Sequence, residues 1–116
     1  MPNPVMQFQI LSKNPDKSAA FYSKLFGWSI NADNALGYRT IDTKSDGIGG
    51  GIWPCPPEGH AFVQLFIHVT DMNKVVEQAK QLGGKVIIPP QKLPDGDELA
   101  ILHDAEGIAF GVYRGK

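Results

Sequence analysis

A repeated sequence pattern is the feature that most constrains how this chain can fold. Residues 46–53 read DGIGGGIW and residues 106–113 read EGIAFGVY, so that acid, glycine, isoleucine, glycine, branched aliphatic and aromatic positions recur in order. Gly27 and Gly83 also recur at nearly matching places, and so do Gln7 and Gln64. A self-similar pattern of this kind predicts two copies of one structural unit.

Each half of the chain reads as a strand, a helix and three further strands. Asn14 is a good N-cap before Pro15, and Gly27 suits the left-handed residue that ends a helix. The expected strands are residues 5–11, 28–33, 37–43, 48–53, 62–69, 86–88, 98–102 and 108–113, and the expected helices are residues 15–26 and 71–82. Pro89 and Pro90 are expected to form a turn, as are residues 94–96 and 104–107.

These elements predict the α+β class, with two βαβββ modules in tandem. Two such modules side by side can form a curved eight-stranded mixed sheet with the helices outside and a concave inner face. We expect one domain over residues 1–116, with module one at about 4–54, a Pro-rich linker at about 54–60 and module two at about 61–115. A concavity between repeats is a natural place for a ligand.

Composition excludes several classes of protein. A formal net charge of −1 gives no basic face for nucleic acid, and no apolar run is long enough to span a membrane. Residues 1–4 lack the features of a signal peptide, and the one cysteine, Cys55, cannot make an internal disulfide. We therefore expect a soluble cytoplasmic protein.

Several motifs resemble those of the vicinal oxygen chelate superfamily, which includes glyoxalase I enzymes, bleomycin-type resistance proteins and extradiol dioxygenases. The resemblance covers essentially the whole chain and is nearest to the small glyoxalase-like proteins. Where this family usually has a proline, the chain has Ala105. The motifs are residues 14–22 (NPDKSAAFY), 25–28 (LFGW), 49–54 (GGGIWP), 82–86 (LGGKV) and 104–107 (DAEG).

The resemblance implies a metal site that this chain does not reproduce. The family's chemistry usually rests on a divalent metal held by His and Glu side chains on the inner face of the sheet. Carried over by strand and phase, the ligand positions fall on Gln7, Gly51, Gln64 and Gly111. Glycine cannot ligate and a neutral amide is a weak ligand, so we expect no tightly held metal and no other cofactor.

Three groups of side chains are candidates for binding a ligand. Strand alternation points Gln7, Gln9 and Gln64 inward, where they either hydrogen-bond a polar ligand or form a satisfied polar set on a wet face. Trp53 and Tyr113 share the phase of Gly51 and Gly111 and either stack on a flat ligand or pack in the core. His68 shares the phase of Gln64 and is the natural general base, although a lone histidine at a strand end is more often structural.

Three functions remain open at this point. The first is metal-independent binding of a small molecule, as in resistance proteins. The second is a glyoxalase-like lyase, isomerase or dioxygenase, with His68 as the best candidate base and a divalent metal as an option. The third is an accessory domain without a ligand. The resemblance alone implies a homodimer, and nothing in the sequence identifies a substrate.

Overall fold

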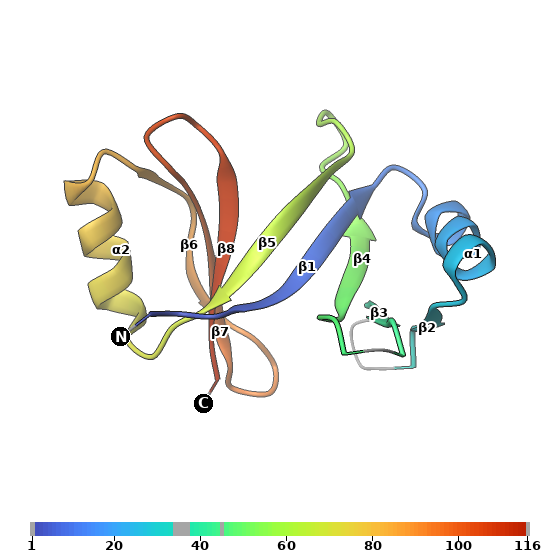
Figure 1. Ribbon diagram of the computed structural model, residues 1–116. Helices are drawn as coiled ribbons and strands as arrows, with labels where there is room; N and C mark the ends of the chain where they lie inside the picture. Colours follow the sequence, from blue (N-terminus) through green and yellow to red (C-terminus); the bar gives the residue numbers. More distant parts are fainter. Residues whose placement is uncertain (1, 34–37, 45, 116) are drawn as a thin grey trace. The chain divides into compact units, whose positions relative to one another are not determined.

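The computed structural model describes residues 2–33, 38–44 and 46–115. These residues form two helices and eight strands, which confirms the α+β class (Figure 1). In chain order the elements are β1 (Val5–Ser12), α1 (Pro15–Phe26), β2 (Ser29–Asn31), β3 (Arg39–Asp42), β4 (Gly50–Pro54), β5 (Phe62–His68), α2 (Met72–Gln81), β6 (Lys85–Lys92), β7 (Glu98–His103) and β8 (Ala109–Arg114).

The chain forms two compact units. The first unit comprises residues 7–64, and the second comprises residues 1–6 together with residues 65–116. In the first unit β1 pairs in parallel with β4, and β2, β3 and β4 pair antiparallel. In the second unit β5 pairs in parallel with β8, and β6, β7 and β8 pair antiparallel. The same strand pattern therefore occurs twice, as the sequence repeat predicts.

Helix α1 begins and ends where the sequence predicts. The side chain of Asn14 accepts a hydrogen bond from the backbone N–H of Lys17 at 3.1 Å, and Pro15 occupies the first turn. Gly27 has φ 74° and its backbone N–H donates to the carbonyl of Ser23 at 2.9 Å, which satisfies one of the free carbonyls at the helix end.

The second unit has a closely packed core under α2. Met72 and Val76 of this helix are buried against the sheet, and Val86 and Phe110 pack at the edge of the same cluster. The remaining buried members come from the end of β5 and from β7 and β8, and they are Val69, Ala100, Leu102 and Val112. Successive side chains of a strand point to opposite sides of the sheet. The other face of these strands is therefore the one that α2 does not cover.

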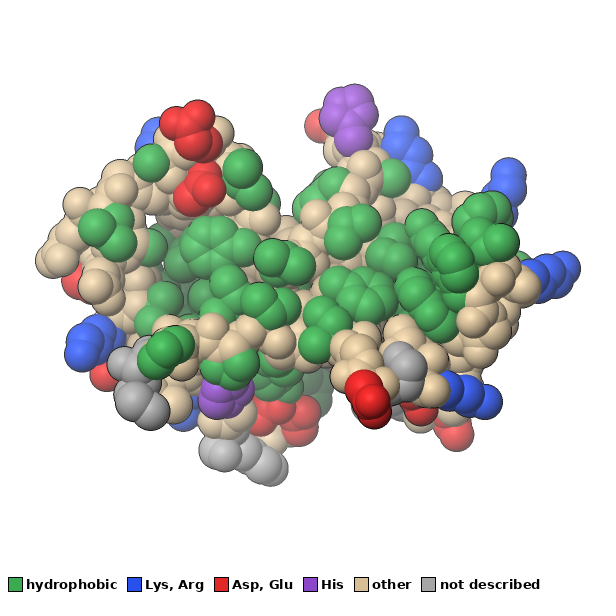
Figure 2. Space-filling view, viewed as in Figure 1, with side chains coloured by type: hydrophobic (Ala, Val, Ile, Leu, Met, Phe, Trp, Pro, Cys, Tyr) green, Lys and Arg blue, Asp and Glu red, His purple; other side chains and the backbone are tan. Residues whose placement is uncertain are grey.

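Helix α1 differs from α2 because it buries none of its residues. Phe21, Leu25 and Phe26 are 58–59% exposed, and Figure 2 shows hydrophobic side chains gathered over α1. The ring of Tyr22 stacks on that of Trp28 at 5.5 Å, and the ring of Phe26 lies 5.3 Å from the same Trp28. The apolar stripe that the sequence predicts is present, but most of it faces outward.

The prediction of a turn at Pro89 and Pro90 is wrong, because both residues lie within β6. Proline cannot donate a hydrogen bond to a ladder and is tolerated on edge strands. Strand β6 pairs with β7 alone, and its register shifts between Val86 and Ile88 and again between Ile88 and Gln91. An edge position with irregular pairing therefore accommodates both prolines.

The short strands of the first unit are shifted relative to the sequence expectation. Strand β2 covers only residues 29–31 of the expected 28–33, and β4 begins at Gly50 rather than at residue 48 and extends to Pro54. Strand β3 covers Arg39–Asp42, and the expected start at Gly37 lies outside the described residues. Neither described helix has the length and apolar character needed to cross a membrane.

Candidate functional site

The eight predicted site residues fall into two groups that the two units hold separately. The first unit contains Gln7, Gln9, Gly51, Trp53 and Gln64, and the second unit contains His68, Gly111 and Tyr113. Each group is positioned by the register of its own strands, and that register decides which side chains share a face.

In the first unit Gln7, Gln9, Gly51 and Trp53 lie on the face of the sheet that α1 does not cover. Gln9 pairs with Gly51, and Leu11 pairs with Trp53, so these four residues share one face of β1 and β4. The residues between them point to the other face. There the ring centroid of Phe8 lies 5.9 Å from that of Trp28, and Trp28 also stacks on Tyr22 of α1. This is therefore the face that α1 covers.

Tyr38 joins this group, although the sequence reasoning did not single it out. Its ring centroid lies 5.8 Å from that of Trp53, with the planes tilted by 44°, and its side chain hydrogen-bonds Gln7. The hydroxyl oxygen is buried. Burial raises the pKa of Tyr38 to about 12, and the hydrogen bond with Gln7 lowers it in part. The phenol therefore stays neutral at physiological pH.

In the second unit His68 and Tyr113 are neighbours in the parallel pairing of β5 with β8. The hydroxyl of Tyr113 donates a short hydrogen bond to the carboxylate of Asp97. Burial raises the pKa of Tyr113, and the hydrogen bond and the charge of Asp97 raise it further. The next residues along the strands form an ion pair, Arg114 with Glu98. The segment at residues 95–98, which carries three carboxylates, is thus tied to β8.

Gln64 is the most buried polar side chain among the predicted residues, at 6% exposed. Within the described part of the chain its amide makes no hydrogen bond. Its amide atoms are nevertheless not fully enclosed. Gln64 can therefore both accept a hydrogen bond from a bound molecule and donate one to it.

The residues at the family's ligand positions do not fit a metal. A Cβ atom added at Gly51 would overlap the phenol of Tyr38, and one added at Gly111 would lie 2.6 Å from the ring of Phe66. Neither position has room for a ligating side chain, and the two remaining positions carry neutral amides. Among residues 2–33, 38–44 and 46–115, no three His, Cys, Asp or Glu side chains group as metal ligands.

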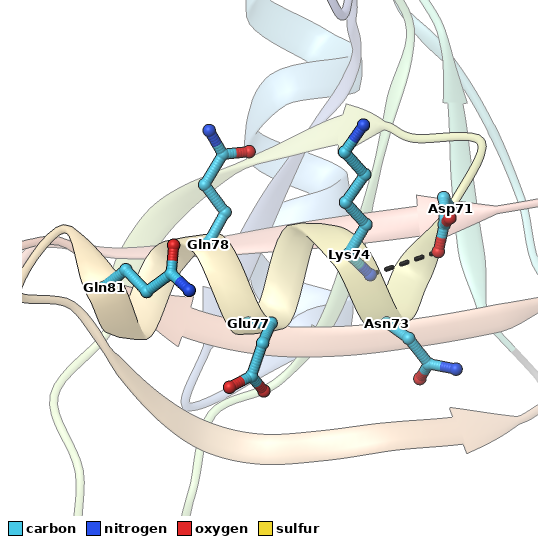
Figure 3. A pocket seen from close by; sticks show the side chains of 6 residues that line it. All are labelled: Asp71, Asn73, Lys74, Glu77, Gln78 and Gln81. Carbon is cyan, nitrogen blue, oxygen red and sulfur yellow. Dashed lines mark hydrogen bonds between the residues drawn. The ribbon is translucent and has the colours of Figure 1, made fainter.

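Two hollows in the surface lie away from all eight predicted residues. One, of about 680 Å³, runs along α2, where Figure 3 shows the polar side chains of residues 71–81 fanning outward from one helix. The dashed contact there is the N-cap, in which Asp71 accepts from the backbone N–H of Lys74 at 3.1 Å. The other, of about 330 Å³, lies between α1 and the strands around Ile30 and Arg39. Side chains that diverge along a helix do not form a binding site, and we assign none to the first hollow.

Comparison with known proteins identifies the family and the fold. The pattern of the glyoxalase-like domain matches residues 7–113. The structure resembles a hypothetical protein from Bacillus halodurans (TM-score 0.74, 14% identity, 100% of this chain and 96% of the other). It also resembles a protein from Legionella pneumophila described as an NAD-dependent benzaldehyde dehydrogenase (TM-score 0.70, 20% identity, 99% and 100% covered).

A third similar structure is a methylmalonyl-CoA epimerase from Mycobacterium tuberculosis (TM-score 0.65, 12% identity, 95% and 86% covered). At these identities the similarity shows the fold alone. No curated protein matches the chain in sequence. Because the family pattern spans nearly all of the chain, this protein belongs to the glyoxalase-like family of the vicinal oxygen chelate superfamily.

Proposed function

We propose that the protein binds an uncharged, planar small molecule without a metal, on the sheet face of the first unit that α1 leaves uncovered. The chemistry of that face carries the proposal. By register and alternation it presents amide, hydroxyl, aromatic and aliphatic groups and one carboxylate, without a Lys or Arg, along the paired residues, namely Gln7, Gln9, Leu11, Ser29, Asn31, Thr40, Asp42, Gly51 and Trp53. Such a face suits a neutral ligand with a few polar atoms.

Trp53 and Gln64 are the residues that we expect to contribute most. Trp53 is 37% exposed, so part of its ring is available for stacking while Tyr38 supports it from the side. Gln64 offers a carbonyl oxygen and an N–H group with no hydrogen bond among the described residues. A planar molecule with an adjacent donor and acceptor satisfies both the ring and the amide.

Ligands that carry phosphate groups do not suit this face. Phosphate recognition in proteins depends on Arg, Lys or clustered backbone N–H groups. Arg39, the one Lys or Arg within strands β1 to β4, pairs with Ile52 on the opposite face and is engaged by Asp16 at 2.5 Å. We therefore expect coenzyme A esters, which carry several phosphates, to bind weakly or not at all.

A screen of uncharged aromatic compounds by thermal shift tests the proposal. We expect a compound that raises the melting temperature of metal-free protein, and at least about 10-fold weaker binding in Trp53→Ala and in Gln64→Ala, because each loses one of the two main contacts. His60→Ala is the matched control, because His60 is exposed and lies in the linker before β5.

Three results would contradict the proposal. The first is a rise in melting temperature that requires added Zn²⁺, Ni²⁺ or Mn²⁺. The second is binding that is equally tight in Trp53→Ala and Gln64→Ala as in the native protein. The third is binding of coenzyme A esters in preference to neutral compounds. If the protein converts a bound compound and this conversion requires His68, which lies beside Tyr113 in the second unit, the result would instead favour an enzymatic function.

We further propose that the protein self-associates through α1. The support is the contrast between the helices: α2 buries Met72 and Val76, whereas Phe21, Leu25 and Phe26 of α1 remain 58–59% exposed. Large exposed apolar side chains on one helix face are typical of an interaction surface.

Sedimentation measurements test this second proposal. We expect the native protein to sediment as a dimer and Phe21→Glu to weaken self-association by at least about 10-fold, because a charge replaces a central apolar contact. Gln78→Glu places the same charge on the exposed polar surface of α2 and should leave the dimer intact. A monomeric native protein at micromolar concentration would contradict the proposal.

A reducing compartment, the cytoplasm, is the location that we propose. The support is Cys55, the single cysteine of the sequence, which is half-buried and free.

A further inference from the structure

The glycines at two of the family's ligand positions face aromatic rings of this chain. At Gly51 an added Cβ would overlap the Oη, Cζ and Cε2 atoms of Tyr38. At Gly111 it would lie 2.6 Å from Cε2 and Cζ of Phe66, whereas real Cβ atoms essentially never approach closer than 3.0 Å. Both positions are therefore closed by neighbouring side chains.

Close approach also occurs at Gly49, Gly50 and Gly84, where an added Cβ would lie 2.5–2.8 Å from a backbone carbonyl oxygen. At Gly51 and Gly111, in contrast, the three nearest atoms all belong to one aromatic side chain. An added Cβ at Gly27 or Gly107 would meet nothing within 4 Å, and one at Gly59 would lie 3.4 Å from its nearest neighbours. Phe66 is only 3% exposed, so its ring cannot move into solvent to make room. Gly51 and Gly111 occupy equivalent places, because Gly51 lies on β4, which pairs in parallel with β1, and Gly111 lies on β8, which pairs in parallel with β5.

Tyr38 reaches Gly51 from the neighbouring strand. Thr40 pairs with Gly51 across β3 and β4, so Tyr38, two residues earlier, lies on the same face and its ring covers the glycine. The same side chain hydrogen-bonds Gln7 of β1. Tyr38 thus contacts Gln7 and Gly51, which are the family's first-strand and fourth-strand ligand positions. A metal bound here would need ligands from both positions.

We propose that Tyr38 replaces the metal of the family by occupying the position beside Gly51 and holding Gln7, and that Phe66 closes the equivalent position at Gly111. The glycines are required by the rings, and the rings fill the space that ligand side chains would take. Adding a side chain at position 51 alone would then disrupt packing rather than rebuild a site.

A double-mutant cycle on Gly51 and Tyr38 tests the inference. We expect Gly51→Ala to lower the melting temperature by at least about 5 °C, because the methyl group collides with a buried phenol. In the Tyr38→Ala background the same substitution should cost less than half as much, because the collision is gone. A cycle isolates this coupling from the separate cost of truncating Tyr38. Gly59→Ala is the matched control and should shift the melting temperature by less than about 2 °C.

Two results would overturn the inference. One is a Gly51→Ala variant as stable as the control, or equally destabilised with and without Tyr38, which would show that the ring does not close the position. The other is a stoichiometric stabilisation of the native protein by ZnCl₂ or NiCl₂ that Tyr38→Ala does not increase. The first result leaves metal-free ligand binding intact, whereas the second also removes that proposal, so the two failures are distinguishable.

Discussion

Replacement of Leu102 by alanine is expected to lower the free energy of unfolding by about 2–5 kcal/mol. Leu102 is 0% exposed and lies in the cluster formed by α2, β7 and β8. Truncation removes buried methyl groups and leaves a cavity that the surrounding strands cannot fully close. Urea unfolding followed by fluorescence measures the change, with a constant slope showing that the unfolding reaction itself is unaltered.

Leu82→Ala is the matched control, because it removes the same atoms from a residue that is 73% exposed at the end of α2. The control should change the free energy of unfolding by less than about 0.5 kcal/mol. Equal losses for the two variants would mean that the core under α2 is not packed as the structure shows.

The arrangement of strands and helices could be predicted from the sequence because it depends on local patterns. Asn14 and Gly27 bound α1 through hydrogen bonds within a few residues, and the alternation of Gln64, Phe66 and His68 sets the faces of β5. The strand placement of Pro89 and Pro90 does not follow from the local pattern, because it depends on β6 lying at an edge, which is a tertiary property.

The composition of the site could be predicted only in part, because its closing contacts come from residues distant in sequence. The run of glycines at residues 49–51 signals a close approach without saying what approaches, and at Gly51 the answer is the ring of Tyr38. Likewise, Asp97 reads as part of an acidic turn, yet it accepts a hydrogen bond from Tyr113. In both cases the sequence shows one partner of a contact, and only the strand register supplies the other.

The exposed apolar residues of α1 also show where prediction from the sequence stops. Their spacing predicts a helix with one apolar side, which is what forms. Whether that side packs inward depends on how closely the helix approaches its sheet. In the second unit α2 buries Met72 and Val76, and in the first unit the corresponding helix buries no residue.

Alkaline pH is expected to destabilise the protein through the buried phenol of Tyr38. Burial raises the pKa of this group from 10.0 to about 12 in the folded chain, so the folded state favours the protonated form. The stability that this preference contributes is complete below pH 10 and is lost as the pH rises through about 12. A shift of one pKa unit corresponds to about 1.4 kcal/mol, and solvent access to the half-buried ring reduces the total to about 1–2 kcal/mol.

Measurement of the free energy of unfolding at a series of pH values between neutrality and the folded pKa tests this expectation. Tyr38→Phe keeps the ring and removes the titrating hydroxyl, so its stability should fall less steeply with pH than that of the native protein. Gln9→Ala, on the same face and without a titrating group, should follow the native slope. Parallel slopes for the native protein and Tyr38→Phe would mean that the hydroxyl is accessible to water. A phenol that water reaches freely could not occupy the closed position beside Gly51, so this titration also bears on how the fold fills that space.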